Sequence, residues 1–500
     1  MSYREFVDAQ KHNNPCLAGL SNFLCDSDLG RRPCRILKLD FTADDGICPE
    51  IQYVEPEQLH KDIYPASGKG RRRLLIIEDL RCDIIQILGA AYNIDPVFFA
   101  SHLHAPFRQM NNQTPNLALL PSRQRKQNFV NFQYHRAVEL KGNVENEIKL
   151  TRDMNVDRKV AVLLPVEGTR IALVQHSCSV ILLPEGGEGW LCLTLVDSPI
   201  LNKNLHIRYN TVLDEDQGVT KQRSQISSRL FLNGYEDFLP PSSLPLGIKG
   251  AYWGSRLSRE SLLDDLQYYW KRELPVMFDA AKPTLFALSF YPLKIIAAEW
   301  NNYMAAMSYH LKRHECAVEV FNRREMKLDK LDAELSSLQA WRRRSLASQQ
   351  KLASVKHFLN LHALRSQDYH NLSGDDAQGV QDDYNYLALT LDDLSRRLKN
   401  MLPVVTSLVQ ISDSRRSLSE SRNVNKLTTL AIVFAPLSFT TGLFSMDTLN
   451  GPGGAHFWVF FAVAVPITII VFLFARPPRW VIRFISTQAR RAHKDHQMQV

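Results

Sequence analysis

The chain has 500 residues, 45% of them hydrophobic, which is enough to build a sizeable core in two or three structural units. The net charge of +8 is modest and comes partly from basic residues beside two apolar segments near the C-terminus, so it does not indicate a nucleic-acid-binding protein. The N-terminus has no apolar signal-peptide core, and the eight cysteines include no CxxC pair, so we expect reduced, structural thiols in a cytosolic N-terminal part.

The first half of the chain predicts an α+β domain. We divide it into a variable N-terminal segment, 1–70, and a cytosolic α/β domain, 71–254, with a mixed or antiparallel sheet and flanking helices. The first expected elements are a strand at 34–41, a solvated basic strand edge at 71–73, a buried strand at 74–77, a helix at 84–91 and a helix from Pro96. Residues 105–125 are rich in Pro, Gln and Asn and predict a loop.

Strand patterns dominate the second part of this domain. The expected strands are 132–140, 159–164, 170–175, 179–183 and 190–196. Between the last two, the Gly-Gly-Glu-Gly sequence at 186–189 predicts a hairpin turn, and the absence of a following Gly-Lys-Ser/Thr excludes a phosphate-binding loop. Residues 198–250 predict a connecting segment.

Long helices and a stalk are expected over 255–426. The predicted helices are 258–272, 285–323 and 326–364, with a break at 371–382. Apolar residues then recur in alternating steps of four and three, as in a coiled coil: Leu387, Leu391, Leu394, Leu398, Met401, Val405 and Leu408. The series becomes polar at Ser412, Arg415, Ser419 and Arg422, which suits either a water-filled mouth or an exposed helix surface.

Two uncharged apolar segments, 427–446 and 457–475, are each long enough to cross the hydrocarbon core of a bilayer, which is about 30 Å thick. Residues 447–456 contain Gly-Pro-Gly-Gly and predict a tight outer loop. Basic residues precede the first segment and fill the tail, 476–500, so the positive-inside rule places both termini in the cytosol. We therefore expect a C-terminal membrane hairpin in a multi-pass plasma-membrane protein; the alternative is a pair of buried helices in a soluble protein.

One face of the first apolar segment carries mostly small residues. Its members follow steps of three or four, namely Leu427, Ala431, Ala435, Ser438, Gly442 and Ser445. A single hairpin encloses no lumen, so this face either lines a pore formed by several copies or packs against other helices in lipid. Asp447 follows it at the expected outer end.

The sequence KLTTLAIVFAPLSFTTGLFSMD, at 426–447, resembles the pore helix of the CorA-type magnesium transporters, whose superfamily includes ZntB-like zinc transporters. It has their Pro-Leu-Ser-Phe core and the Gly that follows, and the resemblance extends over 385–485. The resemblance implies a homopentamer in the lipid bilayer, a central pore lined by the first membrane helix, long stalk helices that gate it, no cofactor and no enzymatic activity.

The family's Gly-Met-Asn signature is here Ser445-Met446-Asp447, so the chain is identified as a divergent eukaryotic member. In a pentamer, the change from Asn to Asp would turn a ring of neutral amides into a ring of carboxylates. Mg²⁺ is usually held through its waters, and conduction requires binding weak enough for release. The carboxylate ring therefore predicts tighter capture with slower release, altered selectivity or loss of transport.

We predict a transporter that carries a divalent cation, Mg²⁺ first, into the cytosol. Asp447 is the expected metal ligand and captures hydrated ions together with Met446; the path is lined by Ser445, Gly442, Ser438, Ala435 and Ala431; Leu427 forms a hydrophobic gate. The alternatives are transport of Zn²⁺, Co²⁺ or Ni²⁺, and a non-conducting membrane-anchored coiled-coil sensor or scaffold. The expected partners are lipid, further copies of the chain and divalent cations, but not nucleic acid.

Other candidate sites have a weaker basis. His102 with His104, and His310 with His314, each offer two metal ligands without an obvious third. The acidic residues between two helices predict either a regulatory cation site or a solvated loop; they are Asp375, Asp376, Asp382 and Asp383. No Ser/His/Asp, Cys/His or paired-carboxylate motif stands in a recognisable local context, so we do not expect an enzyme.

Overall fold

A computed structural model of the chain describes residues 2–25, 32–41, 49–63, 71–103, 126–141, 149–152, 154–166, 168–199, 205–208, 223–238, 261–323, 328–366, 374–445 and 458–475. The chain separates into two compact units. Unit 1 comprises Met1–Met326 and Ala333–Val405, and unit 2 comprises Lys327–Asp332 and Thr406–Val500. The predicted loop at 105–125 lies outside the described residues.

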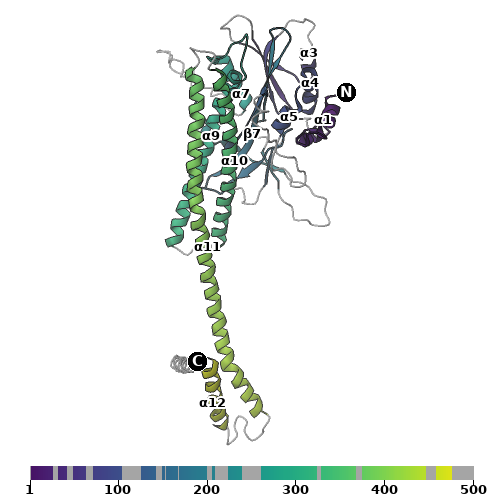
Figure 1. Ribbon diagram of the computed structural model, residues 1–500. Coiled ribbons are helices and arrows are strands. Elements are labelled where there is room, and N and C mark those ends of the chain that lie inside the picture. Colours follow the sequence, from purple (N-terminus) through teal and green to yellow (C-terminus); the bar gives the residue numbers. More distant parts are fainter. Residues whose placement is uncertain are drawn as a thin grey trace, which may run out of the picture. The chain divides into compact units, whose positions relative to one another are not determined.

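A mixed sheet forms the centre of unit 1 (Figure 1). Its strands run in the order β11-β4-β7-β8-β3-β1-β2, and β6 also pairs with β7. Their bounds are β1 Arg35–Asp40, β2 Glu50–Val54, β3 Arg72–Glu78, β4 Phe129–Leu140, β6 Val160–Val162, β7 Arg170–Pro184, β8 Trp190–Val196 and β11 Ser228–Leu230. The β3–β8 pair is parallel and the other pairs are antiparallel, which confirms the predicted α+β class with a mixed sheet.

A second, three-stranded sheet has the order β10-β9-β5. Its strands are β5 Lys149–Arg152, β9 Leu205–Arg208 and β10 Arg223–Gln225. Both β9 and β10, like β11, fall within 198–250, where the sequence predicted only a connection. Each is three or four residues long, which is too short for an alternating pattern to stand out.

Strand β7 corrects the predicted pair of strands at 170–175 and 179–183, because it runs unbroken through the polar residues between them. His176 and Ser177 are buried, and the backbone N–H of Ser177 donates to the carboxylate of Asp197 at 2.7 Å. The polarity of these residues predicts a break in the strand. The strand continues through them because they are buried and hydrogen-bonded to a distant part of the fold. The predicted hairpin turn is present, and Gly186 and Gly187 have the positive φ angles, 44° and 63°, that favour glycine.

Helices cover both faces of the main sheet. Along β3, Leu74 and Ile76 belong to one apolar cluster and Leu75 and Ile77 to the other, as expected for a strand buried on both sides. One face is covered by α1 Tyr3–Lys11, α2 Ala18–Cys25, α4 Cys82–Tyr92 and α5 Pro96–Leu103, and the other by α7 Leu262–Arg272, α8 Leu285–Leu288, α9 Phe290–Arg323, α10 Leu328–Ser366 and the first part of α11 Gly374–Phe444. The remaining described helices are α3 Leu59–Ile63, η1 Pro15–Leu17, η2 Phe231–Asn233 and α12 Trp458–Ala475.

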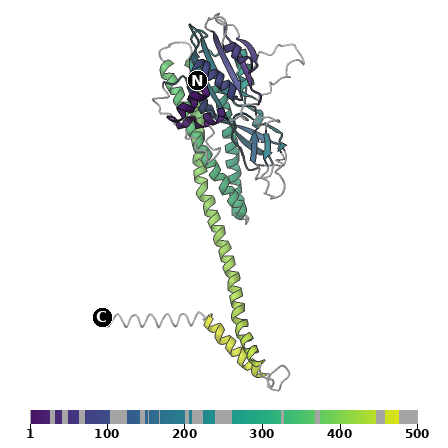
Figure 2. The ribbon, with the colours of Figure 1, turned by 90° about the vertical axis from the view of Figure 1, so that its right-hand side faces the viewer.

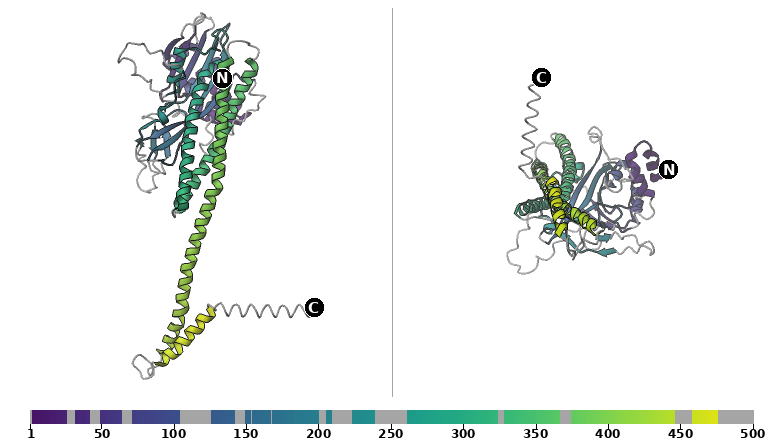
Figure 3. Two further views of the ribbon diagram at one scale, coloured as in Figure 1. Left: turned by 90° about the vertical axis from the view of Figure 1, so that its left-hand side faces the viewer. Right: turned by 90° about the horizontal axis from the view of Figure 1, so that it is seen from below.

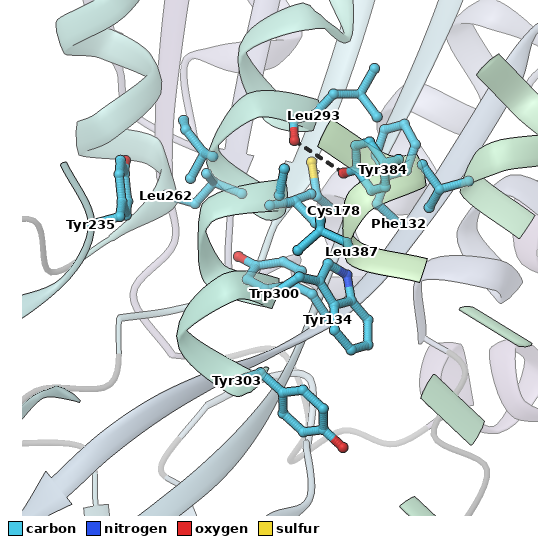
Figure 4. Packing of buried hydrophobic residues seen from close by; sticks show 14 of the residues in the cluster. Phe132, Tyr134, Cys178, Tyr235, Leu262, Leu293, Trp300, Tyr303, Tyr384 and Leu387 are labelled. Atoms are coloured by element: carbon cyan, nitrogen blue, oxygen red, sulfur yellow. Dashed lines mark hydrogen bonds between the residues drawn. The ribbon is translucent and has the colours of Figure 1, made fainter. Parts of the chain in front are cut away.

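The heptad-spaced seam of α11 lies in the core of unit 1. Leu387, Leu391, Leu398 and Val405 are buried in the cluster that also contains residues of α9 and α10, and the Tyr384 hydroxyl donates to the Leu293 carbonyl at 3.0 Å (Figure 4). The seam therefore packs against helices of its own chain. The predicted break at 371–382 is wrong from residue 374 onward, since buried Val380 holds this stretch of α11 in the same core.

Buried ion pairs connect the sheet to its helices. Arg136 on β4 donates from Nε to Glu299 of α9 at 2.7 Å and lies 3.5 Å from Asp265 of α7. Arg73 on β3 is fully buried, pairs with Glu185 and donates to the Tyr92 hydroxyl at 2.7 Å. The predicted solvated edge at 71–73 is therefore wrong for Arg73, because an acidic residue from the β7–β8 turn neutralises it.

Arg136 is expected to be essential for stability, because its removal would leave Glu299 and Asp265 in the core without their cation. Arg136→Met should lower the free energy of unfolding by about 3–5 kcal/mol, measured by thermal unfolding of the purified full chain. Arg396→Met is the matched control; it breaks an exposed pair with Asp392 and should cost less than about 1 kcal/mol. Equal stability of the two variants would contradict the assigned role of Arg136.

Candidate ion pathway

The predicted pore segment forms the last part of α11. Residues 427–444 are helical and uncharged, and α11 is the one described helix that is long and apolar enough to cross a membrane by length and composition. The second predicted segment corresponds to α12, which is apolar but shorter over its searched residues, Trp458–Phe472. Within unit 2, α12 lies beside the final turns of α11 (Figure 2, Figure 3).

The small-residue face of α11 is exposed in the single chain. All six members that the sequence brought together are exposed: Leu427, Ala431, Ala435, Ser438, Gly442 and Ser445. At 3.6 residues per turn, Pro436 and Thr440 fall on the opposite side of the helix, and both are buried. Ala464 is buried on α12. Unit 2 thus covers one side of α11 and leaves the predicted pore-lining side open.

The covered side was not identified from the sequence. Helix geometry could have identified it, because Pro436 and Thr440 lie directly opposite the small-residue face. Leu430, Phe434 and Phe439 flank the small-residue face and are also exposed, so the open surface extends beyond the six small-face residues.

Threonine hydroxyls in this segment are hydrogen-bonded within the helix. Thr428, Thr429, Thr440 and Thr441 each donate to the carbonyl four residues earlier, at 2.7 to 3.0 Å. In a hydrocarbon environment such bonds remove most of the cost of a buried hydroxyl. The threonines therefore fit an apolar surrounding.

Among the described residues, Gly442 has no neighbour that requires a glycine. A Cβ atom built at this position meets no described atom within 4 Å, and the residue lies in the helix with an ordinary backbone conformation. Packing within the described part of the chain therefore gives no reason for the missing side chain.

The stretch before Leu427 is polar and exposed. Arg415, Ser419, Arg422 and Lys426 are all exposed, and Arg416 forms an exposed ion pair with Glu420 at 3.1 Å. The seam thus changes from buried leucines to exposed polar residues within α11, as the sequence predicted. Met446 and Asp447, the two remaining predicted pathway residues, lie outside the described residues.

A Ser–His–Asp series is present in unit 1, but in the wrong place for catalysis. His102 Nδ1 lies 3.0 Å from the Ser179 hydroxyl, and its Nε2 lies 3.6 Å from Asp197. The side chains of His102 and Asp197 are completely buried, and Arg158 neutralises the carboxylate with bonds of 2.8 and 2.9 Å. Burial lowers the pKa of His102 to about 3, so the imidazole stays neutral and serves the core.

The second histidine pair has a partner that the sequence did not reveal. His314 pairs through Nδ1 with Glu334 of α10, and Arg313 donates to the same carboxylate at 2.6 Å. His310 is buried beside Trp341, and neither of its ring nitrogens has a hydrogen-bond partner in the part of the chain that the structure describes. Among the described residues, no group of three His, Cys, Asp or Glu side chains is arranged to hold a metal ion.

The acidic stretch is partly neutralised by neighbours. Asp383 lies 3.0 Å from Lys294 of α9, and Asp382 accepts from Gln378 at 3.0 Å. The side chain of Asp375 and the residue His104 lie outside the described part of the chain. These contacts favour the solvated-helix interpretation over a cation site for the described members.

Residues 261–476 match the model of a family described as CorA-like Mg²⁺ transporter protein. The match begins at the cap of α7, ends just after α12, and so includes every long helix and the candidate pathway. It agrees with the resemblance seen in the sequence: residues 261–476 are similar to the CorA-like Mg²⁺ transporter proteins.

Other comparisons add little to this assignment. A comparison with curated proteins finds no match. The fold is similar to the complete structure of the CorA magnesium transporter from Methanocaldococcus jannaschii, with 13% identity, 89% of this chain and 98% of that chain covered, and a TM-score of 0.38. It is also similar to the full-length CmaX protein, with 12% identity, 92% and 100% coverage, and a TM-score of 0.37. Both scores are too low to support an argument about this chain.

His310 should make the protein sensitive to acid. Burial, together with His314 and Arg313, lowers its pKa from 6.5 to about 3, so protonation favours the unfolded chain as pH falls below about 6.5. His310→Leu should remove this effect. Its free energy of unfolding should decrease between pH 7.5 and pH 4.5 by about 2 kcal/mol less than that of the native chain. Chemical unfolding at both pH values measures this difference.

The control for this experiment is His12→Gln, which changes an exposed histidine and should leave the pH dependence as it is in the native chain. An unchanged pH dependence in His310→Leu would contradict the assigned titration of the buried imidazole.

Proposed function

We propose that the protein is a divalent cation transporter that carries Mg²⁺ into the cytosol through a homopentameric pore lined by residues 427–447. The observation that carries the proposal is the exposed small-residue face of α11, opposite a side that is buried in the chain itself. The family match over residues 261–476 supports the transport of divalent cations. We assign no resident cofactor, because the cation is the cargo.

In this proposal α11 from Leu427 and the whole of α12 span the membrane as a hairpin. The uncharged composition of both helices and the basic residues before the first and after the second support this placement. The loop 447–456 then faces outside, and the termini and residues 1–426 lie in the cytosol.

Several copies are required because one α11 cannot enclose a path. With Pro436 and Thr440 buried on the opposite side, the open face is free to point at a central axis, and its flanks at Leu430 and Phe439 can contact neighbouring copies. Ala431, Ala435 and Gly442 allow close approach, while Ser438 and Ser445 offer hydroxyl oxygens. This division of roles around one helix supports pore lining over simple packing in lipid.

Capture and release follow from the chemistry of the two ends. Mg²⁺ keeps several of its waters, so the Asp447 carboxylates and neighbouring Met446 would hold a hydrated ion at the outer mouth. At the inner end Leu427, 67% exposed in the single chain, would form a ring of isobutyl groups that excludes water when closed. Movement of the stalk helices would widen this ring and rehydrate the path.

The proposal is tested by Mg²⁺ flux into liposomes that contain the purified chain. Asp447→Ala should reduce the flux at least about tenfold, because it removes a charged ligand worth about 1.4 kcal/mol or more. Asp413→Ala, which removes an exposed carboxylate earlier on α11, is the matched control and should leave the flux near the native value. Both variants must be shown to insert and assemble.

The outcomes separate the alternatives. Flux of Zn²⁺ but not Mg²⁺ would keep the pathway and change the ion, as the Ser445–Asp447 departure allows. Unchanged flux in Asp447→Ala would remove this carboxylate from the mechanism. If the inserted, oligomeric native protein passes neither ion, the transport proposal fails and a membrane-anchored sensor or scaffold takes its place.

A further inference from the structure

The side of α11 that we propose to line the pore continues beyond Leu427 toward the start of the helix. Counting back from Leu427 in the same steps of three and four residues gives Val424, Glu420 and Ser417. All three are exposed, and α11 is unbroken between them and the candidate pathway. Glu420 is therefore a charged residue on the proposed pore-lining side, two turns from the proposed gate.

The basic residues of this stretch lie on other sides of the helix. An α-helix turns by about 100° per residue, so Arg415, Arg422 and Lys426 lie at least about 120° around the helix from Glu420. Arg416 is one turn from Glu420 on the same side and pairs with it at 3.1 Å. The two side chains of this pair are 69% and 63% exposed, so the pair is weak. A cation that approaches Glu420 therefore competes with a weakly held partner.

An exposed glutamate in a single chain has no special significance, but the proposed homopentamer places its copies together. The Glu420 side chains of all copies then lie at one level and face one axis. Seven residues of helix rise about 10 Å, so this level is about 10 Å from Leu427 on its cytosolic side. The three basic residues on the other sides point away from the axis, which leaves the inner mouth of the pore with a negative potential.

We propose that Glu420 forms a ring of carboxylates at the cytosolic mouth, which attracts hydrated divalent cations on the inner side of the Leu427 gate. The inference rests on the proposed function, since it requires the pore and its orientation. A hydrated Mg²⁺ suits such a ring, because carboxylates can hold this ion through its waters. The ring raises the rate at which cations pass the open gate, at the opposite end of the path from Asp447.

Asp413 continues the same series but is too distant for this role. It precedes Leu427 by two heptads, or about 21 Å along the helix, whereas charges are screened over about 8 Å at physiological ionic strength. Glu420 stands at about half that distance from the gate. This difference agrees with the expectation that Asp413→Ala leaves the flux near the native value.

The test is Mg²⁺ flux into liposomes at sub-saturating Mg²⁺, in about 0.15 M and about 1 M N-methylglucamine chloride, where the screening lengths are about 8 Å and about 3 Å. At the lower salt concentration, Glu420→Gln should reduce the flux about tenfold, the lower end of the range by which charged clefts raise association rates. At the higher concentration, the native chain and the variant should differ by less than about twofold, because salt screens the attraction of the ring.

Arg416→Gln is the matched control, because it breaks the same ion pair and keeps the carboxylate. At the lower salt concentration its flux should equal or exceed that of the native chain. Both variants are compared at equal amounts of inserted, assembled protein, which is expected to be attainable because the ion pair is exposed.

Unchanged flux in Glu420→Gln at the lower salt concentration, with Mg²⁺ passing the native protein, would overturn the carboxylate ring and leave the proposed pore in place. Equal losses in Glu420→Gln and Arg416→Gln would also overturn it, because the ion pair and not the carboxylate would then matter. A loss that persists at the higher salt concentration would do the same, since attraction over this distance is screened there. If the native protein passes no divalent cation, the proposed function itself fails, so flux of the native chain distinguishes the two failures.

Discussion

Burial of one side of α11 in the core of unit 1 is the interaction on which the rest of the structure depends. An isolated helix of this composition would be marginal in water, because its stability must come from packing of an apolar side. Leu391, Leu398 and Val405 provide that packing, and each fully buried side chain of this kind contributes about 1.5–3 kcal/mol. Tyr384 adds a hydrogen bond to the backbone of α9. The same continuous helix then carries the candidate ion pathway.

Change in surroundings along this helix explains its change in composition. Where α11 packs in unit 1, it presents large aliphatic residues at heptad spacing; between 412 and 426 it presents charged and hydroxyl residues; and from Leu427 it is uncharged on all sides. In the last part, threonine hydroxyls bond to their own helix, and small residues occupy the open face. The composition of each section therefore suits its proposed surroundings: the protein core for the first, water for the second and lipid for the third.

The departure Ser445-Met446-Asp447 concerns selectivity more than architecture. The exposed face from Leu427 to Gly442 precedes the signature, whereas the charge at its outer end depends on one side chain, that of Asp447. A carboxylate strengthens attraction of any divalent cation and slows its release, so rate and selectivity are the properties that this residue would alter.

Local sequence patterns predicted the regular elements well. They could not predict the features that depend on contacts with residues far away in the sequence. The seam of α11, the buried strand β3 and the hairpin turn before β8 follow from spacing and turn chemistry that neighbouring residues contain. The unbroken β7, buried Arg73 and the pairing of His314 with Glu334 depend on residues 20 to 112 positions away. For the pathway, the sequence predicted the shared face, but which side of the helix is buried required coordinates.

The most direct test of the account is whether the open face of α11, and not its covered face, contacts the ion path. Single cysteines are introduced as Ser438→Cys and Thr440→Cys, two residues apart and on opposite sides of the helix, and Mg²⁺ flux is measured before and after a positively charged thiol reagent. Treatment of the native protein accounts for its own cysteines. If the open face lines the path, the reagent should block Ser438→Cys and leave the flux of Thr440→Cys unchanged; block confined to Thr440→Cys, or equal at both positions, would contradict a pore lined by this face.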